Sequence, residues 1–159
     1  MSLPDLFPFT GNWERYEDEL YALYLETVIQ SGIRFRGLPI KARYEPATKG
    51  KGFSFWHLIS EGEREEGRTP DFRRCERMRW VRWFIENAES NAELSWWENK
   101  RGNNTHVVIW HEQESFAVVL AKRDGYFLFK TAYWVKTRRA DDFRRERDAF
   151  WDTQKGWSR

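Results

Sequence analysis

A chain of 159 residues is the size of one domain, and it can bury a core large enough to fold without disulfides or a structural metal. Its single cysteine, Cys75, excludes an intramolecular disulfide and favours a reducing compartment, for which we expect the cytoplasm. The net charge of +2 is modest, and no window approaches the roughly 18 apolar residues of a membrane span. The N-terminus also lacks the layout of a secretory signal, so we expect a protein without a membrane partner.

The N-terminal part of the chain is predicted to be helical. Apolar residues recur over residues 12–31 with the spacing of an amphipathic helix, with Asn12 able to cap its start and Gly32 able to end it. We interpret residues 1–32 as a helical extension. Residues 33–47 then alternate apolar and basic side chains around a glycine and a proline, which predicts a short strand or a pair of short strands.

The middle of the chain alternates between apolar and charged segments. The aromatic and β-branched run FSFWHLIS, residues 53–60, predicts a strand that carries His57. The charged residues 61–70 predict a mobile loop. Residues 71–89 predict a second, Arg-rich helix with one apolar stripe, and residues 91–104 a polar connection. The stripe consists of Phe72, Cys75, Met78, Val81 and Ile85.

The C-terminal third predicts an antiparallel meander of three strands and a closing helix. The strands are expected at residues 107–112, 116–123 and 126–136. Asp124 and Gly125 are a strong signal for a tight hairpin between the last two. Residues 140–151 begin with acidic residues, which suits the start of a helix. The predicted fold is α+β in a single domain over residues 1–159, with an antiparallel sheet of about four to five strands packed with the Arg-rich and C-terminal helices.

Several familiar chemistries lack support in the sequence. It contains no phosphate-binding loop, no dinucleotide-binding glycine motif and no nucleophile elbow, so no cofactor is predicted. His106 and His111 flank one predicted strand at a separation of five, so they face opposite sides and cannot form a metal pair. With one cysteine and no metal-binding spacing, no metal site is predicted either.

Acid–base cleavage of RNA requires none of these groups. RNA brings its own nucleophile in the 2′-hydroxyl, so an enzyme needs a base, cations that stabilise the phosphorane, and an acid for the leaving oxygen. The catalytic candidates are His57, Lys130, Thr131 and Tyr133. On a regular strand Thr131 and Tyr133 share one face and Lys130 takes the other, so one common site requires a bulge or a strand end. Alternatively, His57 is a satisfied strand histidine and the KTAYWV run forms a polar pair on a half-exposed sheet.

Two arginine-rich stretches, residues 73–82 and 138–147, are candidates for phosphate binding. The planar guanidinium grips phosphate and stacks on bases. The alternative is a solvated helix face that acidic neighbours neutralise. In the second stretch those neighbours are Asp141, Asp142, Glu146 and Asp148. The residues that we expect to bind RNA phosphate are Arg73, Arg74, Arg77, Lys100 and Arg101.

Three segments together carry a resemblance to a known family. They are FWHLIS with its aromatic-flanked histidine, the Arg-rich helix RRCERMRWVRW, and the final strand FLFKTAYWV before a basic helix. In this order they resemble prophage-associated members of the barnase/EndoU/colicin/RelE-like ribonuclease superfamily. The similarity covers roughly residues 33–150, which would be the nuclease-like core, and the superfamily shares a fold core more than a fixed signature.

The resemblance implies a small, metal-independent endoribonuclease that cleaves tRNA or mRNA and is often a toxin controlled by an antitoxin or immunity protein. It implies catalytic roles for His57, Thr131 and Tyr133, with Arg74 or Arg77 binding the phosphate. For the acidic base that some members use, the candidates are Glu98 and Glu112. The alternatives are a non-catalytic module that binds RNA or protein, and a phage-related accessory protein.

Overall fold

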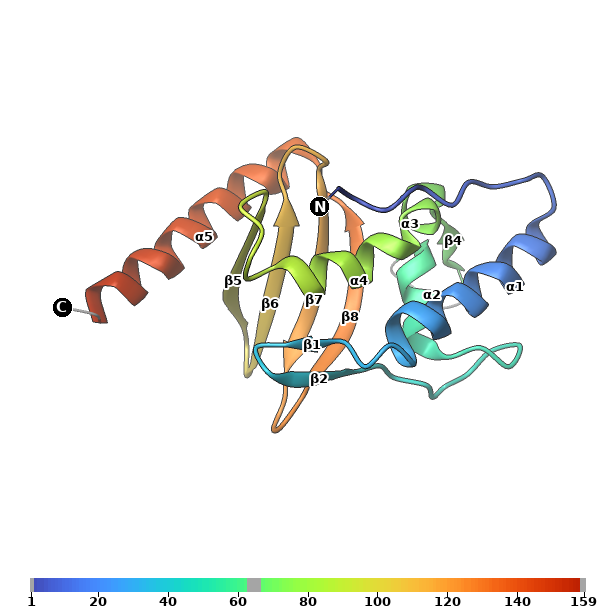
Figure 1. The fold of residues 1–159 in the computed structure, drawn as a ribbon, viewed down its shortest axis with the longest axis horizontal. Coiled ribbons are helices and arrows are strands. Elements are labelled where there is room, and N and C mark those ends of the chain that lie inside the picture. The colour runs from blue at the N-terminus through green and yellow to red at the C-terminus, as the bar shows by residue number, and fades with distance from the viewer. Residues whose placement is uncertain (1, 63–66, 158–159) are drawn as a thin grey trace.

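The computed structural model describes residues 2–62 and 67–157 and shows the predicted α+β fold (Figure 1). The helical elements are α1 (Trp13–Tyr24), the π-helical turn η1 (Leu25–Ile29), α2 (Phe53–Ile59), α3 (Phe72–Glu76), α4 (Met78–Asn87) and α5 (Thr137–Trp157). The strands are β1 (Arg34–Phe35), β2 (Leu38–Lys41), β3 (Ser60–Glu61), β4 (Thr69–Pro70), β5 (Leu94–Arg101), β6 (Asn104–His111), β7 (Phe116–Lys122) and β8 (Phe127–Trp134). They form a six-stranded mixed sheet in the order β1-β2-β8-β7-β6-β5 and a separate pair, β3-β4.

Four antiparallel strands, β5 to β8, form the main part of the large sheet, and β2 joins it parallel to β8. The three predicted C-terminal strands are confirmed as β6, β7 and β8, and the predicted pair of short strands as β1 and β2. The polar connection predicted over residues 91–104 is wrong, because β5 occupies most of it. Only Leu94 and Trp97 of β5 are buried, and they are three residues apart, so the strand lacks the alternation of apolar and polar residues that would have identified it. The strand forms because each of its residues pairs with β6 across the turn at Gly102, where φ is +61°.

The sheet has an apolar core on each face. On one face, Val107 and Ile109 pack with α1, η1 and α4, and Figure 1 shows α4 crossing this side of the sheet. On the other face, Val108 and Trp110 pack against Phe143 of α5. Successive side chains of a strand point to opposite sides, so β6 supplies both cores.

The predicted Arg-rich helix is divided into two helices. Helix α3 starts at Asp71, whose carboxylate accepts hydrogen bonds from the backbone amides of Arg73 (2.9 Å) and Arg74 (3.3 Å). Arg77 then leaves the helical conformation, with φ −100° and ψ 22°, and α4 begins after it. The predicted stripe is buried at Cys75, Met78, Val81 and Ile85, whereas Phe72 is exposed.

The strand predicted for FSFWHLIS is wrong, because this segment forms helix α2. Its aromatic and β-branched residues favour a strand locally, but the buried side chains Phe55, Leu58 and Ile59 follow helical spacing. Packing of this face decides in favour of the helix. As a result Phe53 and His57 lie one turn apart, and their rings stack with centroids 4.1 Å apart.

The remaining helices agree with the sequence. The first helix starts where Asn12 Oδ1 accepts a hydrogen bond from Arg15 N (3.1 Å), and the C-terminal helix is longer than predicted. Of the predicted mobile loop, residues 63–66 lie outside the described residues, and the flanking residues form β3 and β4. Within the described part of the chain, no helix combines the length and apolar character needed to cross a membrane.

Candidate active site

A cavity of about 400 Å³ brings all four predicted catalytic residues together. It lies on the face of the sheet that α5 partly covers, since Val119 and Thr131 sit opposite each other there in β7 and β8. Helices α2 and α3, strands β3, β5 and β6, and residues between β3 and β4 supply the remaining lining. Six of the residues that line the cavity were predicted from the sequence: His57, Arg74, Arg101, Lys130, Thr131 and Tyr133. The others are Glu61, Gly62, Arg68, His106 and Val119.

A β-bulge makes this arrangement geometrically feasible. Val119 pairs with Thr131, but the next residue of β7, Leu120, pairs with Phe129, so Lys130 is an extra residue in β8. A bulge locally reorients the side chains of its strand. Lys130 therefore reaches the same cavity as Thr131 and Tyr133, which a regular strand would not allow.

His57 reaches the cavity from the last turn of α2 and is only partly buried. One side of its ring stacks on Phe53, and the guanidinium of Arg43 lies over the Phe53 ring at 4.4 Å. Its backbone carbonyl accepts a hydrogen bond from Thr131 Oγ1 (3.3 Å). Thr131 thus connects the bulged strand to the helix that carries the histidine.

Two arginines close the C-terminal end of α2. Arg74 Nη1 donates to the backbone carbonyls of His57 (3.2 Å) and Ser60 (2.7 Å). Arg68 Nη2 donates to the same two carbonyls, at 3.3 Å and 2.6 Å. Such contacts satisfy carbonyls that have no partner within the helix. Arg74 therefore positions His57, and burial lowers the pKa of its guanidinium.

His106 is a cavity residue whose acid–base role the sequence did not indicate. It projects from β6 and pairs with Asn99 and Ala121 in the neighbouring strands. Burial lowers its pKa below the usual 6.5, and the positive charges of Arg101, Lys130 and Arg123 lower it further. Its imidazole is therefore neutral near neutral pH and able to accept a proton.

Three of the predicted phosphate-binding residues lie outside this cavity. Arg73 and Arg77 place their guanidinium groups over the Trp134 ring, at 4.4 Å and 5.5 Å. Lys100 is exposed near the end of β5 and does not line the cavity.

Neither candidate for an acidic base reaches the cavity. Glu98 pairs with Lys122 (3.3 Å), and Glu112 pairs with Arg144 (2.8 Å). The carboxylate that does line the cavity is Glu61. Neither Glu61 nor Arg68 was distinguishable from the rest of the charged loop in the sequence.

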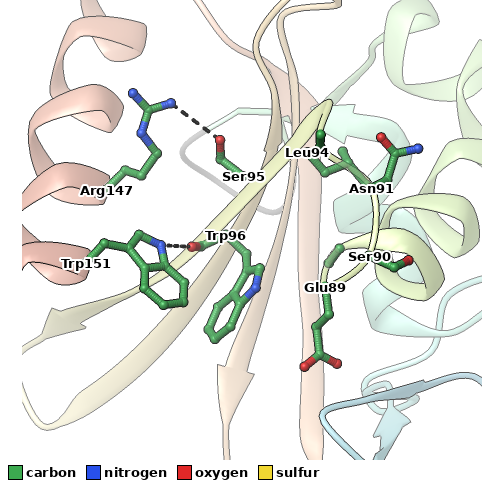
Figure 2. Close-up of a pocket in the computed structure, with 10 residues that line it drawn as sticks. Glu89, Ser90, Asn91, Leu94, Ser95, Trp96, Arg147 and Trp151 are labelled. Carbon is green, nitrogen blue, oxygen red and sulfur yellow. Dashed lines mark hydrogen bonds between the residues drawn. The ribbon is translucent and has the colours of Figure 1, made fainter. Parts of the chain in front are cut away.

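A cavity of about 450 Å³ lies elsewhere, along β5 (Figure 2). Trp151 Nε1 of α5 donates to the backbone carbonyl of Trp96 (2.7 Å), and Arg147 contacts Ser95 Oγ (3.4 Å). No histidine lines this cavity, and Arg147 is already paired with Asp148 (3.0 Å). We therefore assign the candidate active site to the smaller, His-containing cavity.

The described residues contain no group of three or more His, Cys, Asp or Glu side chains that could hold a metal ion. His106 and His111 lie on opposite faces, and His111 is buried, with its Nδ1 accepting a hydrogen bond from Glu114 N (3.2 Å). Compared with protein-family models, with curated proteins and with solved structures, the chain matches none.

Proposed function

We propose that this protein is a metal-independent endoribonuclease that cleaves RNA at the His57–His106 cavity. The observation that carries the proposal is the presence of two imidazoles around one cavity together with Lys130 and Arg101. Two proton carriers and fixed cations are what cleavage by the RNA 2′-hydroxyl requires. The resemblance to the ribonuclease superfamily points to the same chemistry.

The proposed step gives each group one role. His106 takes the proton of the 2′-hydroxyl, because its lowered pKa keeps it neutral. The 2′-oxygen then bonds to phosphorus, and Lys130 and Arg101 stabilise the charged phosphorane. The bond between phosphorus and the 5′-oxygen breaks, and His57 donates a proton to that oxygen. The products are a 2′,3′-cyclic phosphate and a 5′-hydroxyl.

Thr131, Arg74 and Tyr133 complete the site. Thr131 and Arg74 hold the backbone at His57, so they are positioning residues. Tyr133 lines the cavity with a hydroxyl that can donate to a phosphate oxygen.

The test is incubation of RNA in excess EDTA with the wild-type protein and with the His57→Gln and His106→Gln variants. We expect fragments with 2′,3′-cyclic phosphate ends from the wild type, and at least about a hundredfold slower cleavage from each variant. Thermal unfolding of the three proteins controls for folding. Intact RNA in the wild-type reaction, with the protein folded, would refute the proposal.

A second candidate is an RNA-binding module without catalysis. The guanidinium groups over the Trp134 ring favour it, because stacked arginines and aromatics bind single-stranded RNA. This candidate predicts RNA binding that survives His57→Gln and leaves the RNA intact.

The partner and compartment follow from the nuclease proposal. A free ribonuclease in the cytoplasm is toxic, so we propose an antitoxin or immunity protein that covers the cationic cavity. Cytoplasmic location fits the lone Cys75, which is buried and whose pKa burial raises to about 12, so it stays an inert thiol. Expression of the wild type and of His57→Gln in a host tests this, since only the wild type should arrest growth.

A further inference from the structure

We propose that a second cavity, next to the candidate active site, binds the phosphate of the neighbouring nucleotide, so that the substrate is a single-stranded RNA with a phosphate flanking the scissile one. This cavity has a volume of about 290 Å³. Its charged and polar lining consists of Asp71, Arg73, Arg74, Tyr133, Lys136 and Arg139. The inference rests on the proposed ribonuclease function, whose site it extends.

The two cavities share a wall. Arg74 and Tyr133 line both of them. An RNA strand whose scissile phosphate lies between His57 and His106 therefore passes Tyr133 to reach the second cavity. We therefore place adjacent phosphates of one strand in the two cavities.

The second cavity carries an excess of positive charge. Four cationic side chains line it against the single carboxylate of Asp71. Arg74 lies 3.6 Å from that carboxylate, and Arg139 is paired with Glu146 at 2.9 Å. Among the described residues, no carboxylate is paired with Arg73 or Lys136. These two cations can therefore bind an anionic ligand.

Two buried donors in this lining are not fully satisfied. Arg139 Nη2 has no hydrogen-bond partner within residues 2–62 and 67–157, and Arg74 Nε has only the 3.6 Å ion pair with Asp71, which is too long for a hydrogen bond. A buried donor without an acceptor is costly, and phosphate oxygens are the acceptors that guanidinium groups bind best. Charge, open volume and unused donors thus agree on a phosphate as the ligand.

The test compares three short RNAs that share one scissile dinucleotide: the bare dinucleoside monophosphate, its 5′-phosphorylated form and its 3′-phosphorylated form. Cleavage is measured with the wild type, with Lys136→Ala, and with Arg138→Ala as the matched control. Arg138 is an exposed cation close by in α5 that lines neither cavity, and Lys136 is also exposed, so both variants should fold.

We expect one of the two added phosphates to raise kcat/KM of the wild type about tenfold, the value of one charge-assisted contact. Lys136→Ala should lose this gain, while its rate on the bare dinucleotide stays the same, and Arg138→Ala should keep the gain. Equal kcat/KM for the three RNAs in the wild type would overturn the inference, as would loss of the gain in both variants.

A binding experiment separates this inference from the proposed function. The salt dependence of oligouridylate binding is measured for the same three proteins. Loss of one phosphate contact should reduce the slope of log K against log salt by about 0.7 in Lys136→Ala alone. If the wild type cleaves no RNA but this difference appears, the ribonuclease proposal fails and the phosphate subsite stands. Equal slopes in Lys136→Ala and the wild type would overturn the subsite.

Discussion

Replacing Lys130 by glutamine should remove catalysis without affecting the fold. Lys130 is the extra residue of the bulge in β8, and it lines the cavity together with His106 and Arg101. The substitution removes a cation that would stabilise the phosphorane. It also removes one of the charges that lower the pKa of His106, so this pKa should rise towards its usual value.

The substitution should affect the free energy of unfolding and the cleavage rate very differently. Lys130 is exposed and in no ion pair with the described residues, so its loss should change the free energy of unfolding by less than about 0.5 kcal/mol. A single group that stabilises transition-state charge is worth a factor of about 100 to 1,000 in rate. We therefore expect Lys130→Gln to cleave at least about a hundredfold more slowly at unchanged stability.

Deletion of Lys130 provides an independent check. Without it, Phe129 and Thr131 become neighbours that still face opposite sides, as their partners Leu120 and Val119 do, so the ladder becomes regular. The deletion variant should keep Thr131 in the cavity, fold, and be as inactive as Lys130→Gln.

The assay is single-turnover cleavage of a fluorescent RNA, with urea unfolding of each variant. Lys122→Gln is the control, because it removes the same charge from an exposed lysine of β7 outside the cavity. Wild-type rates in Lys130→Gln would refute the reasoning, and so would equal rate losses in both glutamine variants.

Three further changes test other parts of the structure. His106→Gln should weaken the pH dependence of stability. Because the pKa of His106 in the folded protein lies below 6.5, the unfolded chain binds more protons, and the stability of the wild type falls as the pH drops through and below 6.5. Urea titrations at several pH values should show a smaller fall in the variant. Phe143→Ala should destabilise the protein by about 3–5 kcal/mol, because the ring is fully buried against Trp97 (5.1 Å) and anchors α5; thermal unfolding measures this, and a change below about 1 kcal/mol would contradict it. Thr131→Val removes the hydrogen bond to the His57 carbonyl, so kcat should fall while KM and the unfolding midpoint change little; a rise in KM at constant kcat would instead indicate a substrate contact.

The sequence predicted the parts of the fold that local patterns determine. The first helix has a capping residue and a helical apolar period, and the three C-terminal strands have turn signals between them. Strand β5 could not be predicted because its stability comes from pairing with β6 rather than from its own composition. Helix α2 was not predicted, because its aromatic and β-branched residue types favour a strand. The helical spacing of its buried residues Phe55, Leu58 and Ile59 was the opposing signal.

For the site, the sequence provided chemistry but not geometry. It identified His57, Thr131 and Tyr133 by residue type, and all three line one cavity. The bulge is visible in the spacing of the buried residues of β8: Phe127 and Phe129 are two residues apart, as in a regular strand, whereas Phe129 and Ala132 are three apart. The lowered pKa of His106 depends on its burial in the folded protein and then on the charges of Arg101, Lys130 and Arg123, which no single segment of the sequence contains.

The contact between Trp151 and the backbone of Trp96 bears on self-association. An edge strand of eight residues is a template on which another chain can add a strand, and β5 is such an edge. The Trp151 indole occupies one of its outward-facing carbonyls, so α5 blocks the start of a new ladder there. At the opposite edge, β1 has only two residues, which is too short to seed one. The sheet is thus protected at both edges, and removal of α5 should expose β5 to pairing with a strand of another chain.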